Sequence, residues 1–223
     1  DELPDGDAIV LMNEVLDNVP ARLVDRTTDG WHEVVVDAVH GGLVLASRPA
    51  DAALSTWCDH HLGDVPVGAR LAAQVAAAGL LSQMLKRSGR TRLCVIDYAA
   101  DTATLATRPP TGVVRTFRSH REALDLLAEP GATDVTVELN SDLVERVAET
   151  HQATISTESQ ADFLVRWGAS DVMDELTARS FEAARRGDVM EQLRFKSDAT
   201  GVRALLDSSG LGGFSVFLME SGT

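Results

Sequence analysis

Two apolar runs, each followed at once by acidic or amide side chains, constrain the fold of this chain most strongly. The first covers residues 8–12 and stops at Asn13 and Glu14, and the second covers residues 93–96 and stops at Asp97. Unbroken apolar runs of this length are typical of strands buried on both faces of a parallel sheet. A helical pattern between them predicts a β-α-β unit, whose right-handed crossover brings both carboxyl ends to one edge of the sheet.

Polar side chains at that edge are candidates for a ligand site, because open α/β sheets bind ligands outside the carboxyl ends of their strands. The first strand delivers Asn13, Glu14 and Asp17, and the second delivers Asp97 and Tyr98. The alternative is an ordinary junction of strand and loop, whose polar residues only cap a helix. Spacing alone leaves both interpretations open.

Composition argues against several classes of function. The 223 residues suffice for one domain with a sizeable core, and 44% of them are hydrophobic. The net charge of -14 argues against binding to nucleic acid or to an anionic membrane surface, and favours a basic protein segment as partner. No apolar run approaches the length of a membrane span, and no targeting segment is visible. Two cysteines, Cys58 and Cys94, fit a reducing cytoplasm.

The remaining patterns predict the outline of the chain. A small antiparallel excursion is expected at about residues 20–46, and a helix over residues 69–86 should join the two buried strands. Residues about 100–135 form a connection too long for an idle loop, and we interpret it as a lid or substrate wall. Strands are expected at 134–139, 153–157 and 214–220, and further helices at 142–150, 159–167, 171–186 and 198–207.

A cluster of metal-ligand types stands at residues 57–61, which read Trp-Cys-Asp-His-His. Neighbours in sequence cannot all point at one ion from a regular element, and no second cluster offers the remaining ligands. We therefore expect no metal site, and a solvated loop over residues 49–68.

Short motifs follow one another along most of the chain. The first is Asn13-Glu14-x-x-Asp17-x-x-Pro20. The others are Trp31-His-Glu33, Val95-Ile-Asp97-Tyr98, Arg115-Thr-Phe-Arg-Ser-His120, Pro130-Gly-Ala-Thr-Asp134-Val-Thr136 and Gln160-Ala-Asp-Phe-Leu-Val-Arg-Trp-Gly168. In this order the series resembles the MidA family of S-adenosylmethionine-dependent methyltransferases, which includes a mitochondrial arginine methyltransferase of complex I assembly.

The resemblance implies an α/β fold: a partial class I, Rossmann-like methyltransferase sheet with helices on both faces and an antiparallel last strand. Residues 1–223 would be the C-terminal part of such a domain, because the family's glycine-rich cofactor loop has no counterpart here. S-adenosylmethionine is then expected for the full-length protein but not for this chain alone. A sheet without its first strands keeps an unpaired edge, so a homo-oligomer or a retained N-terminal fragment is also expected.

The resemblance also implies roles for the residues at the strand ends. Glu14, Asp17 and Asp97 would be the catalytic carboxylates, since a fixed carboxylate can pair with a guanidinium group while its nitrogen attacks. The substrate-binding residues would be Asn13, Tyr98 and His120. The sequence departs from the family at Ala99, where glycine is usual, at Glu138, where histidine is usual, and at Ala72 or Ala73, where the family has an acid.

Two functions therefore compete. The first is a methyltransferase that modifies an arginine of a protein, a respiratory complex subunit for instance, with this chain as its substrate-binding half. The alternative is a catalytically inactive, methyltransferase-like protein-binding or complex-assembly factor, which the departures favour for the chain as given. A hydrolase is disfavoured, because no Gly-x-Ser-x-Gly motif occurs.

Overall fold

A four-stranded sheet forms the centre of the structure, a computed structural model that describes residues 6–118, 121–122 and 125–222. Its strands are β1 (Ala8–Asn13), β6 (Thr91–Asp97), β13 (Ser215–Ser221) and β12 (Thr154–Ser159), in the order β1-β6-β13-β12. β1 and β6 are parallel, whereas β13 is antiparallel to both of its neighbours. This arrangement confirms the predicted α/β sheet with an antiparallel last strand.

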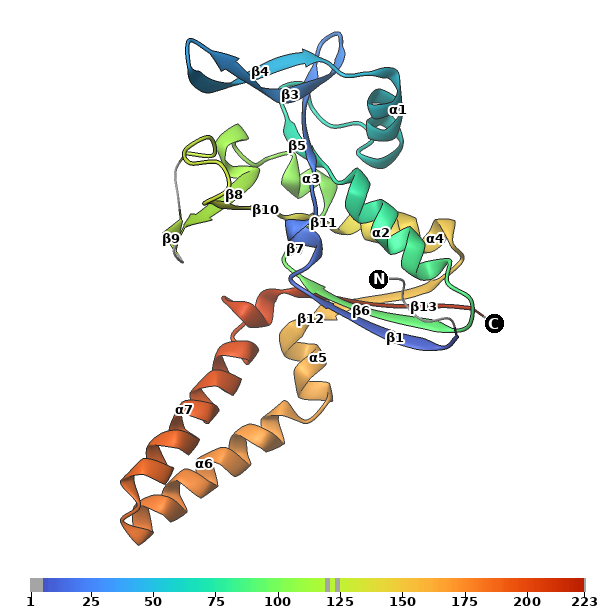
Figure 1. Cartoon of the computed structure of the whole chain (residues 1–223). Coiled ribbons are helices and arrows are strands. Elements are labelled where there is room, and N and C mark those ends of the chain that lie inside the picture. Colours follow the sequence, from blue (N-terminus) through green and yellow to red (C-terminus); the bar gives the residue numbers. More distant parts are fainter. Residues whose placement is uncertain (1–5, 119–120, 123–124, 223) are drawn as a thin grey trace.

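Two helices cover one face of this sheet. They are α2 (Val75–Leu85), which joins β1 to β6 across the intervening elements, and α4 (Ser141–Thr150) (Figure 1). Their apolar side chains pack on the inward-facing residues of the strands, with Leu81, Val95 and Phe217 fully buried. Burying such side chains contributes about 1.5–3 kcal/mol each, so this layer dominates the stability of the central unit.

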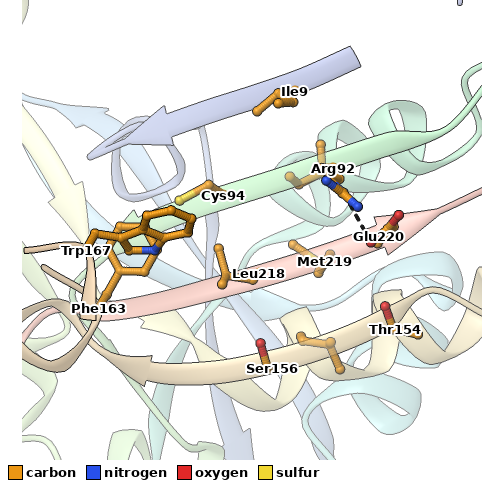
Figure 2. Close-up of a pocket in the computed structure, with 12 residues that line it drawn as sticks. Ile9, Arg92, Cys94, Thr154, Ser156, Phe163, Trp167, Leu218, Met219 and Glu220 are labelled. Carbon is orange, nitrogen blue, oxygen red and sulfur yellow. Dashed lines mark ion pairs between the residues drawn. The ribbon is translucent and has the colours of Figure 1, made fainter. Parts of the chain in front are cut away.

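The opposite face of the sheet is open. Along β1, Met12 points into the core, but Ile9 is 80% exposed and Leu11 is 64% exposed. The prediction of a strand buried on both faces was therefore wrong for β1 in this chain. Helix α5 (Gln160–Arg166) contacts β12 and β13. Its Phe163 and the following Trp167 lie at one end of the open face (Figure 2).

A second, antiparallel sheet stands beside the central unit, in the order β4-β3-β2-β5 (Figure 1). It consists of β2 (Arg22–Thr27), β3 (Gly30–Val39), β4 (Gly42–Pro49) and β5 (Arg70–Ala73). Helix α1 (Ala52–His61) packs on it through Leu54 and the buried thiol of Cys58.

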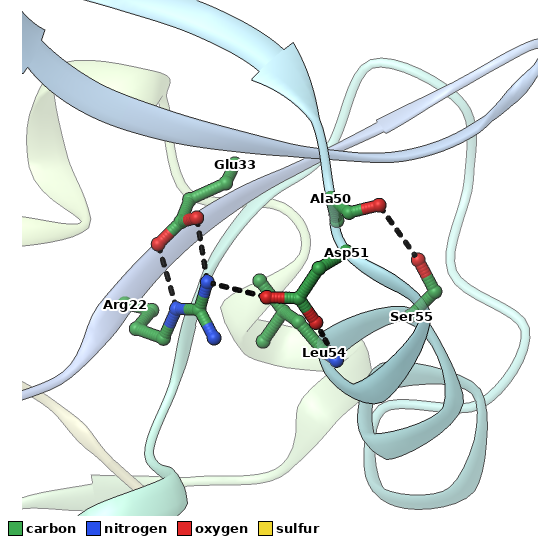
Figure 3. A network of polar contacts seen from close by, with 6 residues as sticks. All are labelled: Arg22, Glu33, Ala50, Asp51, Leu54 and Ser55. Carbon is green, nitrogen blue, oxygen red and sulfur yellow. Dashed lines mark hydrogen bonds and ion pairs between the residues drawn. The ribbon is translucent and has the colours of Figure 1, made fainter.

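Polar contacts fix the start of α1 on this sheet (Figure 3). Arg22 donates two hydrogen bonds of 2.6 Å to Glu33 on the neighbouring strand and one of 3.2 Å to Asp51. Asp51 in turn caps the helix by accepting a hydrogen bond of 2.7 Å from the backbone amide of Leu54.

Two sequence-based boundaries were wrong here. Residues 70–73, expected at the start of a helix, form strand β5 because they pair with β2 in the sheet, and the helix begins only at Val75. Pairing across the sheet outweighs the helix propensity of the alanines. Residues 52–61, expected in a loop, form α1 because the cap at Asp51 and the burial of one face stabilise a helix.

The segment after β6 contains several short elements. They are β7 (Ala99–Ala100), α3 (Thr102–Leu105), a 3-10 turn (Pro110–Gly112), β8 (Val114–Arg118), β9 (Arg121–Glu122), β10 (Asp134–Val137) and β11 (Leu139–Asn140). β8 pairs with β10 and β9, and β7 pairs with β11 in parallel. These pairings bring Thr136 and Glu138 back toward the end of β6.

A long helical hairpin projects from the central unit between β12 and β13 (Figure 1). It is formed by α6 (Ala169–Arg186) and α7 (Val189–Leu206), and a 3-10 turn (Leu211–Gly213) leads from it into β13. α7 begins nine residues before the predicted position 198. Among the described residues, no helix combines the length and the apolar character that a membrane crossing requires.

Candidate active site at the ends of β1 and β6

Asp97, the last residue of β6, organises the site. Its side chain is fully buried, and its Oδ2 atom accepts hydrogen bonds from the backbone amides of Leu16 (3.1 Å) and Asp17 (3.2 Å). Its Oδ1 atom accepts one from the backbone amide of Tyr98 at 3.0 Å. The carboxylate thus holds the turn that follows β1, which contains the 3-10 segment Leu16–Asn18.

Glu14 lies between the end of β1 and that turn. Its backbone amide donates a hydrogen bond of 2.9 Å to the carbonyl oxygen of Ile96, which keeps it beside the end of β6. Its φ angle is +50°, a left-handed conformation that non-glycine residues rarely adopt. The side chain is exposed, so its carboxylate is accessible to a ligand. Strain of this kind is typical of functional sites and must be compensated by surrounding contacts.

Asp17 and Tyr98 form a polar cluster beside Asp97. The Nδ2 atom of Asn18 donates a hydrogen bond of 2.6 Å to Asp17, and the Tyr98 hydroxyl donates one of 2.7 Å to Thr136 on β10. The guanidinium carbon of Arg115 lies 5.2 Å from the centre of the Tyr98 ring. Tyr98 therefore links the strand end to the segment that we interpreted as a substrate wall.

Burial shifts the pKa values of all three groups upward. The pKa of Asp97 is raised to about 7, first by desolvation and second by the nearby charge of Asp17. Burial also raises the pKa of Asp17, although the hydrogen bond from Asn18 opposes the shift. The pKa of Tyr98 rises to about 12 through burial, so its hydroxyl keeps its proton at neutral pH. Perturbed acids at the end of parallel strands mark a candidate site.

The structure brings most of the predicted site residues together. Asn13, exposed at the end of β1, pairs with Ile96 in the register of the two strands, next to Glu14. Glu14, Asp17, Asp97 and Tyr98 lie at the same edge of the sheet. His120 lies outside the residues that the structure describes.

Gln74 is a residue of this region that sequence reasoning missed. It precedes α2 and is buried, where its Nε2 atom donates a hydrogen bond of 3.1 Å to the carbonyl oxygen of Glu138 and its Oε1 atom accepts one of 2.9 Å from the amide of Asn140. The signal was present, because Gln74 is the one polar residue in an otherwise apolar stretch over residues 71–78. The resemblance instead points to Ala72 or Ala73, which lie in β5.

Glu138, at the position where the resemblance implies a histidine, has a structural partner. Arg108 donates hydrogen bonds of 3.0 and 2.9 Å to its two carboxylate oxygens. Asn140, nearby, caps α4 and donates a hydrogen bond of 2.9 Å to Thr102. These contacts join β11, α3 and α4 into one support below the site.

The glycine-rich segment at residues 210–213 has a structural role. Gly212 and Gly213 belong to a turn that precedes a strand, and a Cβ atom on either would meet backbone atoms of residues 206–208 at 2.5–2.8 Å. Their small size therefore serves close packing of the chain, whereas a nucleotide-cradling loop follows a strand and opens a helix. Nor do the described residues contain a group of three or more His, Cys, Asp or Glu side chains that could hold a metal ion.

Comparison with known proteins adds a family. A family model described as "Putative S-adenosyl-L-methionine-dependent methyltransferase" matches residues 1–159. Among curated proteins, the mitochondrial protein arginine methyltransferase NDUFAF7 of Danio rerio is 25% identical over 190 residues, which cover 83% of this chain and 43% of that protein. NDUFAF7 of Homo sapiens is 25% identical over 198 residues, which cover 85% of this chain and 42% of that protein.

Two solved structures from Burkholderia thailandensis share the fold. An uncharacterized protein superposes with a TM-score of 0.81 at 25% identity, over 99% of this chain and 57% of its own. A second structure, bound to S-adenosyl-homocysteine, has a TM-score of 0.79 at 25% identity, over 100% of this chain and 55% of its own. This chain thus spans about half the length of the proteins that it matches.

Proposed function

Because the chain belongs to the family of S-adenosyl-L-methionine-dependent methyltransferases, whose model matches residues 1–159, we propose that it is the substrate-binding part of an enzyme that methylates a protein arginine. The family match confirms the resemblance drawn from the motifs. The arginine is a proposal, and it is supported by the curated relatives, which are named protein arginine methyltransferases.

The observation that carries this proposal is the position of Glu14. It follows a strand that runs parallel to β6, its backbone is tied to Ile96, and its carboxylate is exposed beside the buried Asp97. A carboxylate fixed in this way can pair with the planar guanidinium fork through two parallel hydrogen bonds. Pairing aligns the nucleophilic nitrogen and balances its charge, which is the help that methyl transfer requires from a protein.

The neighbouring residues would then position Glu14 and shape the site. Asp97 holds the turn after β1 through the amides of Leu16 and Asp17, so in our proposal it acts on Glu14 through the backbone. Asp17 and Tyr98 would form the wall beside the guanidinium group, with Asn13 at its rim. The net charge of -14 favours a basic segment as the protein substrate.

We propose S-adenosylmethionine as the cofactor of the full-length protein and expect no binding by these residues alone. The relatives are about twice as long as this chain, and Gly212 and Gly213 serve close packing before a strand. Among the described residues β1 is an edge strand, to which further strands would add, and the exposed side chains of Ile9 and Leu11 belong to the open face beside that edge.

Methyl transfer to arginine by the full-length product of the gene tests the proposal. Mass spectrometry of a cell extract incubated with isotopically labelled S-adenosylmethionine should find label on arginine of a protein. Glu14→Gln should abolish this labelling. Glu145→Gln, a change on α4 that is remote from the candidate site, should preserve it. Cofactor binding without methyl transfer would instead support the inactive assembly factor, and retained turnover in Glu14→Gln would refute the role of Glu14.

A further inference from the structure

The face of α6 that points away from α7 carries four side chains in a self-complementary order. Asp174, Ala178, Phe181 and Arg185 follow one another at helical spacings of four, three and four residues, which places them in one row. All four are exposed, and Phe181 is 65% exposed. Ala183, on the other side of the helix, is fully buried. The row therefore belongs to the outer face of the hairpin.

The two ends of the row carry opposite charges. Elsewhere on α6, Arg179 forms an ion pair with Glu175 at 3.5 Å. Neither Asp174 nor Arg185 forms an ion pair with another residue in the part of the chain that the structure describes. One end of the row is thus acidic, the other is basic, and a large apolar ring lies between them.

A hollow accompanies Phe181 on this face. It is lined by Ala178, Phe181, Glu182, Ala184 and Arg185, so two alanines lie between the larger side chains. An aromatic ring from another helix could lie on Ala178, because alanine leaves room for close approach. Large apolar side chains that are exposed together with such a recess are typical of association surfaces.

We propose that this row is a dimerisation seam and that its occupant is a second copy of the same chain. Two α6 helices that pack antiparallel about a two-fold axis would set Phe181 on Ala178 of the second copy. In that same register Asp174 faces Arg185 of the second copy, because both pairs are centred between Arg179 and Ser180. The symmetry repeats each contact, which gives two aromatic contacts and two ion pairs.

The surroundings of the row are compatible with this register. Glu182, next to Phe181, would face the uncharged Thr177 of the second copy, so no like charges meet at the centre of the seam. The hairpin projects from the central unit, which leaves its outer face clear of the rest of the chain (Figure 1). An 18-residue helix is about 27 Å long, so the contact is small and the dimer should be reversible and concentration-dependent.

Charge reversal on the intact chain tests the seam, with sedimentation velocity over a range of concentrations as the measurement. Asp174→Arg sets arginine against arginine, and Arg185→Asp sets aspartate against aspartate. We expect each change to weaken the dimer by about tenfold or more, because two pairs are reversed. Phe181→Ala should weaken it as well, and Arg203→Asp, on α7, is the control that should leave it unchanged. Circular dichroism checks that each variant keeps its helices.

Variants that restore the opposite charges at positions 174 and 185 test the proposal most directly. The double variant Asp174→Arg with Arg185→Asp should dimerise like the original chain. An equimolar mixture of the two single variants should form a heterodimer, because one copy then carries only arginines in the row and the other only aspartates. A chain that stays monomeric, a dimer that survives both single reversals, or single variants that fail to associate when mixed would overturn the proposal. If the two copies paired through the edge of β1 instead, the dimer would survive both single reversals.

Discussion

Asp97 accepts a hydrogen bond of 3.1 Å from the backbone amide of Leu16, although the two residues are 81 positions apart. The same oxygen accepts a second bond from the amide of Asp17 at 3.2 Å. The end of β6 thereby fixes the turn that follows β1, and Glu14 lies in the segment between them.

Asp97 should make stability depend on pH in a defined direction. Its pKa is about 7 in the folded chain, against 3.8 for an unperturbed aspartate. Between these values the folded state holds a proton that the unfolded chain has lost, so the free energy of unfolding falls as the pH rises from about 4 to about 7 and then levels off. The difference of about three pKa units corresponds to at most about 4 kcal/mol, and Asp17 adds in the same direction.

Urea unfolding at pH 5 and pH 8 measures this dependence. The chain should be more stable at the lower pH, and Asp97→Asn should remove most of the difference. Asp134→Asn, an exposed aspartate on β10, is the matched control and should keep it. An unchanged difference between the two pH values in Asp97→Asn would show that another group is responsible.

We expect Glu14 to lower the stability of the fold and yet to be required for methyl transfer. Its left-handed backbone disfavours glutamate by about 1 kcal/mol, whereas asparagine tolerates this conformation better. Glu14→Asn should therefore raise the free energy of unfolding by up to about 1 kcal/mol while it abolishes methyl transfer by the full-length protein. Urea unfolding and the transfer assay measure the two effects. A variant that is less stable than the original chain would mean that the Glu14 side chain makes contacts beyond its backbone strain.

The Tyr98 hydroxyl should lose its proton at a much higher pH than the hydroxyl of an ordinary tyrosine. Burial raises its pKa to about 12, and it is the one tyrosine in the sequence, so ultraviolet absorption of tyrosinate reports it directly. At pH 10 the folded chain should show only a small fraction of the full tyrosinate signal, whereas the chain unfolded in urea should be about half ionised. Tyr98→Phe removes the signal and serves as the blank. Half ionisation at pH 10 in the folded chain would argue that Tyr98 is open to solvent.

Gln74 should be necessary for stability despite its polar side chain. Gln74→Leu keeps a similar volume but leaves the carbonyl of Glu138 and the amide of Asn140 without their side-chain partners. Each unsatisfied buried group costs about 1–3 kcal/mol, so the free energy of unfolding should fall by roughly 2–6 kcal/mol. Thermal or urea unfolding measures the change, and Gln83→Leu on the exposed face of α2 provides the comparison. A loss equal to that of Gln83→Leu would contradict the contacts of Gln74.

The sequence predicted the parts of the fold that local patterns encode. The apolar runs before Glu14 and Asp97 were long enough to identify β1 and β6, and their parallel pairing placed both acids at one edge. Residues 70–73 were assigned to a helix because alanine favours helices locally, and only pairing with β2 reveals a strand.

Contacts between segments that are distant in the chain could not be predicted from the sequence, for a different reason. The hydrogen bond of Tyr98 to Thr136 and those of Gln74 to residues 138 and 140 depend on how the segment after β6 folds back. Neither periodicity nor spacing describes that path. The exposure of Ile9 and Leu11 also escaped the sequence, because an apolar run does not reveal whether both faces of its strand are covered.

The outer edge of β1 connects the binding of another polypeptide to the orientation of Glu14. In the part of the chain that the structure describes, the six residues of β1 have no strand partner on their outer side, and they lead directly into Glu14. Any polypeptide that docks along this edge would set the tilt of the strand and, with it, the aim of the glutamate. A variant that associates more weakly would then show a lower turnover even if its catalytic residues were intact. Turnover measured at several protein concentrations would separate the two causes.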